Sequence, residues 1–307
     1  MKNALSMLSA VIVLVALGQV SVPEALAGPL VQVVEVSGHR DRFDMGAPVF
    51  VRYLLIDPGN ADPAVDGFAP IAPQAVLMLF TGGDGRLNLA PGQINTGSTN
   101  FVVRTRYHFA AEGYVVAVVD AASDFLAHNH ADTTDAAGFL HGSGLRGHRL
   151  PNRLYGDKYL QDLGAVMNDL RARYPNLRLW AVGTSRGTIS AAVAAAHATP
   201  PPDGIVLTSS LTGPSAPGDL QSVNLEAITV PALIVSHRDD GCAVTRPDDS
   251  RELKRRFVSS PRARVQVFHG GSTPLSDPCD PLSAHGFFGV EQKVIEDISK
   301  WIRRVEP

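Results

Sequence analysis

The sequence predicts an α/β fold: a mostly parallel, twisted sheet of about eight strands with helices on both faces. Short runs rich in Val, Ile and Leu alternate with longer amphipathic segments, as in chains built from repeated strand–helix units. Several of the short runs are apolar at every position, which is typical of parallel strands buried on both faces. With 307 residues, 45% of them hydrophobic and 19% charged, the chain can bury a large core, which excludes a disordered protein.

The predicted strands extend from near the N-terminus to the last fifth of the chain. The first two are spaced to form a hairpin, and the later ones are short, β-branched and separated by helical segments. In order, they are Val31–Val36, Pro48–Ile56, Ala75–Phe80, Tyr114–Val119, Leu177–Val182, Gly204–Thr208, Ala232–Ser236 and Arg264–Phe268.

The helical segments lie between these strands. In Lys158–Tyr174 the apolar residues recur at helical spacing and form one stripe. The other predicted helices are Ser185–His197, which is Ala-rich, Asp248–Phe257 and Val290–Arg304. Because no linker, internal repeat or charge block divides the chain, we expect a single domain over residues 28–307.

The first 27 residues have the composition of a secretory signal peptide. Lys2 precedes the apolar run Ala4–Gly18, and Ala25-Leu26-Ala27 matches an A-x-A cleavage site. A membrane anchor is the alternative, but the apolar run is shorter than the roughly 20 residues that a spanning helix needs. We therefore expect an exported protein, periplasmic or secreted, without stable membrane insertion after cleavage.

One internal segment, Ala121–Asp157, has no clear period and is rich in Gly, His and Arg. It follows a predicted strand, where long loops form active-site walls in open α/β sheets. Its histidines match no regular metal-ligand spacing, so we expect no metal there. The chemistry that we expect for this chain, described below, calls for no cofactor either. The net charge of −3 gives no basic field, so nucleic acid is not an expected partner.

The main chemical motif is Gly183-Thr184-Ser185-Arg186-Gly187, which has the form G-x-S-x-G. A predicted strand leads directly into it and an Ala-rich helix follows directly. This is the setting of a nucleophile elbow, in which a sharp turn holds the serine above the sheet. An ordinary glycine-rich strand–helix turn is the alternative. The context favours Ser185 as a nucleophile.

A serine nucleophile needs a base, and the base needs an orienting acid, which in this architecture come in the chain order Ser, acid, His. His285 lies in a polar loop after the last predicted strand, so we prefer it as the base over His269. Asp240 and Asp239 follow the strand Ala232–Ser236, and both remain candidates for the acid. We prefer Asp240, because it lies in a tight turn.

Glycines also follow the strand Ala75–Phe80, in the sequence Thr81-Gly82-Gly83-Asp84-Gly85. Such a turn can direct a backbone N–H at a developing oxyanion, and we expect Gly83 and Arg186 to supply the two donors. No Gly-Lys-Ser/Thr follows, which excludes a P-loop. No helix opens at once, which counts against a dinucleotide site.

Both cysteines, Cys242 and Cys279, lie outside the predicted signal peptide. In an oxidising compartment two cysteines usually pair, so we expect a disulfide; two buried free thiols are the alternative.

Together, Gly183–Gly187, Asp240, His285 and the Gly-Gly turn resemble the α/β-hydrolase superfamily. The segments around Asp240 and Ser283–Phe287 are similar to those of exported bacterial hydrolases, distantly like dienelactone hydrolases. The turn lacks the His-Gly of many esterases, which leaves the identity of its N–H donor open.

This resemblance covers nearly all of the chain after the signal peptide. It implies a serine hydrolase that cleaves a carboxylic ester of a small-molecule acyl substrate, with Ser185, Asp240 and His285 as nucleophile, acid and base. Two alternatives remain: a non-catalytic binding protein of the same fold, and an acyltransferase or peptidase that uses the same triad.

Overall fold

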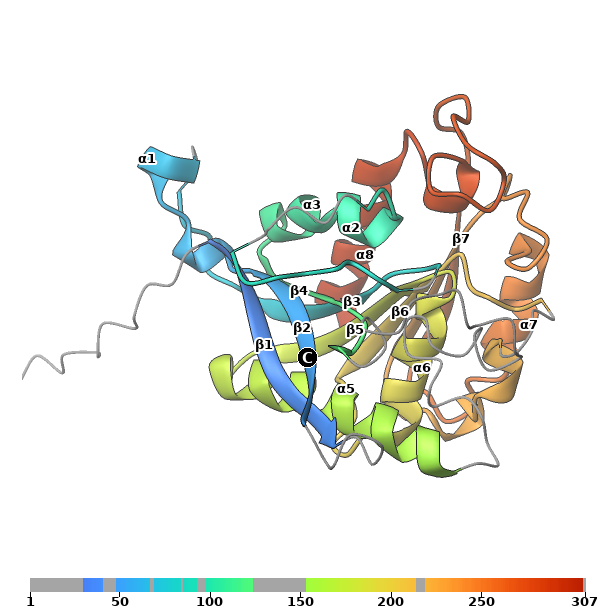
Figure 1. Ribbon diagram of the computed structural model, residues 1–307. Helices are drawn as coiled ribbons and strands as arrows, with labels where there is room; N and C mark the ends of the chain where they lie inside the picture. Colours follow the sequence, from blue (N-terminus) through green and yellow to red (C-terminus); the bar gives the residue numbers. More distant parts are fainter. Residues whose placement is uncertain are drawn as a thin grey trace, which may run out of the picture.

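The computed structural model describes residues 30–40, 48–66, 69–83, 85–92, 98–123, 153–213 and 219–305. The predicted signal peptide and residues 124–152 of the irregular segment lie outside the described residues, as does Asp84. In the part of the chain that is described, an eight-stranded sheet lies between two layers of helices (Figure 1). This confirms the predicted α/β architecture.

The strand order is β1-β2-β4-β3-β5-β6-β7-β8. β1 pairs antiparallel with β2, and β2 pairs antiparallel with β4. The pairs from β4 to β8 are all parallel, so the sheet is mostly parallel, as predicted. The bounds are β1 Val31–Arg40, β2 Pro48–Ile56, β3 Ala75–Phe80, β4 Tyr114–Val119, β5 Arg178–Thr184, β6 Gly204–Thr208, β7 Ala232–His237 and β8 Ala263–Phe268.

The helices differ from expectation in three respects. The three short helices α1, α2 and α3 were not predicted, and α5 begins at Arg153, inside the segment expected to be irregular. The predicted helix 248–257 is shorter, because a 3-10 turn over Pro247–Asp249 precedes it. The bounds are α1 Pro63–Asp66, α2 Phe101–Arg104, α3 Arg106–Ala111, α5 Arg153–Arg173, α6 Gly187–His197, α7 Ser250–Arg255 and α8 Glu291–Val305.

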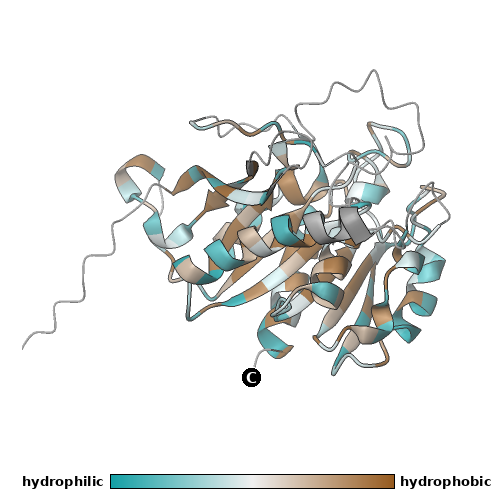
Figure 2. Cartoon of the chain, turned by 60° about the horizontal axis from the view of Figure 1, so that its bottom comes forward, coloured by the Kyte–Doolittle hydropathy of each residue, from teal (hydrophilic) through white to brown (hydrophobic). Residues whose placement is uncertain are grey.

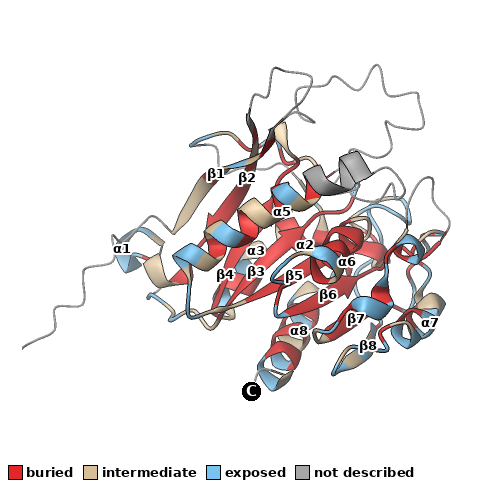
Figure 3. Cartoon of the chain, turned by 90° about the horizontal axis from the view of Figure 1, so that it is seen from below, coloured by how far each residue is buried: buried red, intermediate tan, exposed pale blue. Residues whose placement is uncertain are grey.

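Each face of the sheet has its own hydrophobic core. α5, α6 and α7 cover one face, and α2, α3 and α8 cover the other. The residues of β3, β4, β6 and β7 are buried throughout, whereas the outer faces of the helices carry hydrophilic, exposed residues (Figures 2 and 3). On the second face Trp180 of β5 packs edge-on against Trp301 of α8, with ring centroids 5.5 Å apart. None of the described helices is long and apolar enough to cross a membrane.

The parallel strands place their carboxyl ends at one edge of the sheet, where open α/β folds build their sites. Thr81 follows β3, Ser185 follows β5 and Asp240 lies after β7. His285 comes from the segment between β8 and α8. The residues singled out in the sequence therefore meet at this edge.

Candidate active site

Ser185 occupies the sharp turn between β5 and α6. Its φ of 54° lies in the left-handed region, which is unfavourable for a residue with a side chain and is found mainly where the surrounding structure enforces it. The turn is held in place by the Ser185 N–H, which donates to the carbonyl of Thr208 on β6 at 2.9 Å. This is the conformation that the G-x-S-x-G sequence predicts.

The glycines of the motif are required by close backbone contacts. A Cβ on Gly187 would lie 2.3 Å from the carbonyl oxygen of Phe80, and one on Gly183 would lie 2.2 Å from the oxygen of Gly187. A Cβ on Gly82 would lie 2.9 Å from Cβ of Ser185. Real Cβ atoms do not approach backbone atoms this closely, so the turn after β3 and the serine turn pack directly on each other.

His285 and Asp240 form a buried pair. Nδ1 of the imidazole lies 3.0 Å from Oδ2 of the carboxylate, and the two side chains are 6% and 1% exposed. Because a carboxylate only accepts hydrogen bonds, Nδ1 carries the proton in this arrangement. The lone pair of a neutral imidazole is then on Nε2, where it can accept a proton.

Two further donors fix the carboxylate of Asp240. The backbone N–H of Cys242 donates to Oδ1 at 3.0 Å, and the hydroxyl of Thr245 donates to Oδ2 at 3.0 Å. The Thr245 oxygen also lies 3.1 Å from Nδ1 of His285, so it contacts both members of the pair. Thr245 could not be identified from the sequence, because a threonine five residues from an aspartate carries no recognisable signal.

Hydrogen bonds also hold the backbone N–H and carbonyl groups of His285. The hydroxyl of Ser283 accepts the N–H of His285 at 3.2 Å, and the hydroxyl of Ser209 donates to the His285 carbonyl at 2.7 Å. Phe287 follows in the left-handed region with a φ of 58°, and its buried ring packs against Phe101, centroid to centroid, at 4.9 Å.

Cys242 and Cys279 form the predicted disulfide. Cys242 contacts Asp240 through its backbone N–H, and Cys279 lines the same cavity as Ser185 and His285. The bond therefore links the segment that carries Asp240 to the segment that leads into His285.

The alternative acid and base lie elsewhere. Asp239 has a side chain that is 54% exposed, and its hydrogen bond to Arg238 lowers the pKa of its carboxyl. His269 is exposed, and the ring of His237 lies 2.9 Å from the carbonyl of Gly270. Neither Asp239 nor His269 shares the hydrogen-bonded cluster of Asp240 and His285.

Ser185 and His285 line one cavity of about 380 Å³, together with Gly82 and Gly83. Gly83 has a φ of 66°, and a side chain there would meet open space, so its backbone is accessible from the cavity. Arg186, the other expected donor, directly follows Ser185 and precedes α6.

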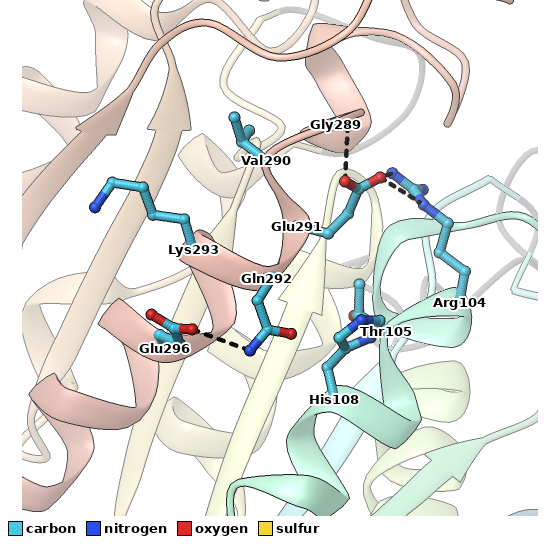
Figure 4. A pocket seen from close by; sticks show the side chains of 9 residues that line it. All are labelled: Arg104, Thr105, His108, Gly289, Val290, Glu291, Gln292, Lys293 and Glu296. Carbon is cyan, nitrogen blue, oxygen red and sulfur yellow. Dashed lines mark hydrogen bonds and ion pairs between the residues drawn. The ribbon is translucent and has the colours of Figure 1, made fainter.

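A larger cavity, of about 660 Å³, lies between α2, α3 and the start of α8 and contains neither Ser185 nor His285 (Figure 4). Within the described ranges, no group of three His, Cys, Asp or Glu side chains is arranged to hold a metal ion.

The sequence matches no protein-family model and no curated protein. Solved structures do resemble the fold. A cold-adapted esterase from an Arctic intertidal metagenomic library, solved with bound PEG, is 14% identical over 88% of this chain and 94% of its own, with a TM-score of 0.52. An α/β serine hydrolase homologue from Coxiella burnetii is 15% identical over 82% and 91%, with a TM-score of 0.50.

A third structure, Est1E from Butyrivibrio proteoclasticus with bound ferulic acid, is 13% identical over 83% of this chain and 95% of its own, with a TM-score of 0.50. At these identities the likeness concerns the fold. In this chain the described strands form one mostly parallel sheet, and a strand leads through the turn at Ser185 into a helix. This chain therefore has the α/β-hydrolase fold.

Proposed function

We propose that the protein is a serine hydrolase that cleaves a carboxylic ester, or a related acyl bond, through Ser185, His285 and Asp240. The observation that carries the proposal is the buried Asp240–His285 pair, whose imidazole lines the same cavity as a serine held in a left-handed turn. A protein that only binds a ligand has no need for a histidine poised in this way beside a strained serine.

In the proposed reaction the Ser185 hydroxyl attacks the carbonyl carbon while Nε2 of His285 takes its proton. The negative charge on the carbonyl oxygen is stabilised by the backbone N–H groups of Gly83 and Arg186. The C–O bond of the ester then breaks, and the leaving alcohol takes the proton from His285. Water attacks the acyl-enzyme by the same route and releases the acid. Asp240 stabilises the imidazolium formed in each half.

A fluorophosphonate probe and a panel of chromogenic acyl esters test this proposal. The wild-type protein should gain the mass of one phosphonyl group on Ser185 and turn over at least one ester. Ser185→Ala should lose both, with a drop in turnover of about 10⁴-fold or more. His285→Ala should cost about as much, since the three residues act as a unit. Acyl transfer to an added alcohol or amine would favour the acyltransferase alternative.

The matched pair Asp240→Asn and Asp239→Asn tests the acid. Both changes remove one carboxylate from the same turn, but only Asp240 is bonded to His285. We expect Asp240→Asn to reduce turnover far more. A greater loss in Asp239→Asn would show that the acid is misassigned.

Export is part of the same proposal. It is supported by the signal-peptide pattern of residues 1–27 and by the disulfide, which is a bond typical of oxidising compartments. The mature protein should begin at Gly28 when its N-terminus is sequenced from the periplasmic or extracellular fraction. An intact N-terminus in the cytoplasmic fraction would contradict export.

A further inference from the structure

Asn100 precedes α2 and is held at three points. Its side-chain Oδ1 accepts the N–H of Val102 at 3.3 Å, and its carbonyl accepts the N–H groups of Val103 and Arg104 at 3.0 and 2.9 Å. Its own N–H donates to the hydroxyl of Ser98 at 3.3 Å. Because the capping bond fixes Oδ1 toward the helix, the amide nitrogen Nδ2 is directed away from it.

The amide nitrogen lies beside the nucleophile. The position that a Cβ would take on Gly82 lies 3.2 Å from Nδ2 of Asn100 and 2.9 Å from Cβ of Ser185, so both side chains lie next to the same point above Gly82. Asn100 lines the cavity that contains Ser185 and His285. Within the part of the chain that the structure describes, the Nδ2 hydrogens have no acceptor, although the rest of the residue is fully bonded.

We propose that Asn100 is a further catalytic residue, whose amide N–H donates to the negatively charged oxygen that forms when Ser185 attacks an acyl carbon. The proposal rests on the proposed function and adds a side-chain donor to the backbone N–H groups of Gly83 and Arg186. A donor fixed in place before the reaction stabilises developing charge without reorganising. The capping bond supplies that fixation, since it orients the amide whether or not substrate is bound.

Three substitutions separate this role from the role of Asn100 in capping α2. Asn100→Ser keeps a side-chain acceptor suited to the cap but loses the amide donor. Asn100→Asp keeps the shape and the cap, and replaces the donor with a negative charge. Asn100→Ala loses both the cap and the donor.

We expect Asn100→Ser to lower kcat by about 10²-fold, the usual effect of losing one oxyanion donor, with KM and the thermal midpoint little changed. Asn100→Asp should lower kcat further than Asn100→Ser does, because its carboxylate repels the negative charge that develops on the substrate oxygen. Asn100→Ala should lose as much activity as Asn100→Ser but should also unfold at a lower temperature.

Binding of a trifluoromethyl ketone, which forms an oxyanion adduct with an active serine, gives a second measurement. Its affinity should fall in parallel with kcat/KM across the variants, because both report stabilisation of the same charge. Wild-type affinity and kcat in Asn100→Ser would overturn the role of Asn100 while the proposed hydrolase stands. If the wild-type protein neither reacts with fluorophosphonate nor hydrolyses any ester, the proposed function fails and the role of Asn100 fails with it.

Discussion

Arg104 and Glu291 form an ion pair, 2.8 Å between Nη2 and Oε1, that joins the end of α2 to the start of α8 (Figure 4). The same guanidinium donates to the carbonyl of Thr99 at 2.8 Å and to the carbonyl of Gly286. Thr99 and Gly286 both line the cavity of Ser185, and Gly286 follows His285. One side chain thus fixes two walls of the candidate site relative to each other.

Arg104→Met should therefore impair turnover, although Arg104 does not line the cavity of Ser185. The methionine keeps the aliphatic stem but removes all donors, which releases the loop of His285; small misplacements of catalytic groups can cost up to about 10²-fold. Glu291→Gln is the matched control, because it removes the ion pair but leaves the bonds to Thr99 and Gly286. Steady-state kinetics should show a much smaller loss in the control. Equal losses in the two variants would assign the effect to the ion pair alone.

Thr245→Val should slow the reaction while the protein stays folded. Valine matches the shape of threonine but removes the hydroxyl that donates to Asp240 and contacts His285. Hydrogen bonds to charged groups contribute about 1.5–3 kcal/mol, so a loss of roughly 10-fold or more is expected. Thr245→Ser should restore the rate. The proton NMR signal of Nδ1–H should shift in Thr245→Val and return in Thr245→Ser; equal impairment of both variants would point to the methyl group.

Breaking the Cys242–Cys279 disulfide should lower the rate more than it lowers the folded fraction. The bond closes a sequence separation of 37 residues, for which a chain-entropy model gives roughly 4 kcal/mol of stability. It also holds the N–H that orients Asp240. Activity and near-UV circular dichroism, followed together in a reductant titration and in the Cys242→Ala, Cys279→Ala double variant, separate the two effects. If the activity and circular dichroism curves coincide, the disulfide affects activity only through the stability of the whole fold.

Asp120, which follows β4, should make stability depend on pH. Its buried carboxylate accepts backbone N–H groups from Leu87, Leu89 and Ala121, each at 2.7 Å. Burial raises its pKa above the usual 3.8 despite these bonds. The folded state then holds the proton of Asp120 more tightly than the unfolded state does. The resulting contribution to the free energy of unfolding is fully present at pH values below the pKa that Asp120 has in the unfolded chain. It is lost as pH rises through the folded pKa.

Urea unfolding of wild type and Asp120→Asn at a series of pH values from 4 to 7 measures this effect. The difference in unfolding free energy, wild type minus variant, should shrink as pH rises from about 4 and then level off. Subtracting the free energy of unfolding of the variant from that of the wild type removes the contributions of the other titrating groups, which both proteins share. A difference that widens with pH would mean that the hydrogen bonds outweigh burial in setting the pKa.

β3 and β4 could be predicted from the sequence because each is a continuous apolar run, and a run buried on both faces has few other structures available. The turn at Ser185 could be predicted because its glycines mark contacts that no side chain permits. α1, α2 and α3 were missed because helices of four to six residues are too short to show a periodic stripe.

The finer features of the site depend on contacts distant in sequence. In the sequence only the tight turn favours Asp240 over the neighbouring Asp239, whereas burial and the hydrogen bond to His285 distinguish the two in the structure. Asn100 does carry a local signal, since asparagine before the apolar Phe101–Val103 favours a helix start. That signal predicts the cap, but the proximity of the Asn100 amide to Ser185 follows from the packing of α2 against β3 and β5.

The glycine contacts around Ser185 also indicate where new substrate preferences can arise. Gly183, Gly187 and Gly82 leave no room for even a methyl group, so random substitution there should yield mainly inactive protein. The cavity is also bounded by segments such as residues 98–101 and 279–281, which line it from outside the serine turn. A mutant library directed at Thr99, Asp280 and Pro281 of those segments, with Asn100 and Cys279 kept, should retain the proposed triad while changing the shape and polarity of the acyl groups that fit. Directed evolution of this scaffold should therefore begin at those three positions and leave the glycines, Asn100 and Cys279 unchanged.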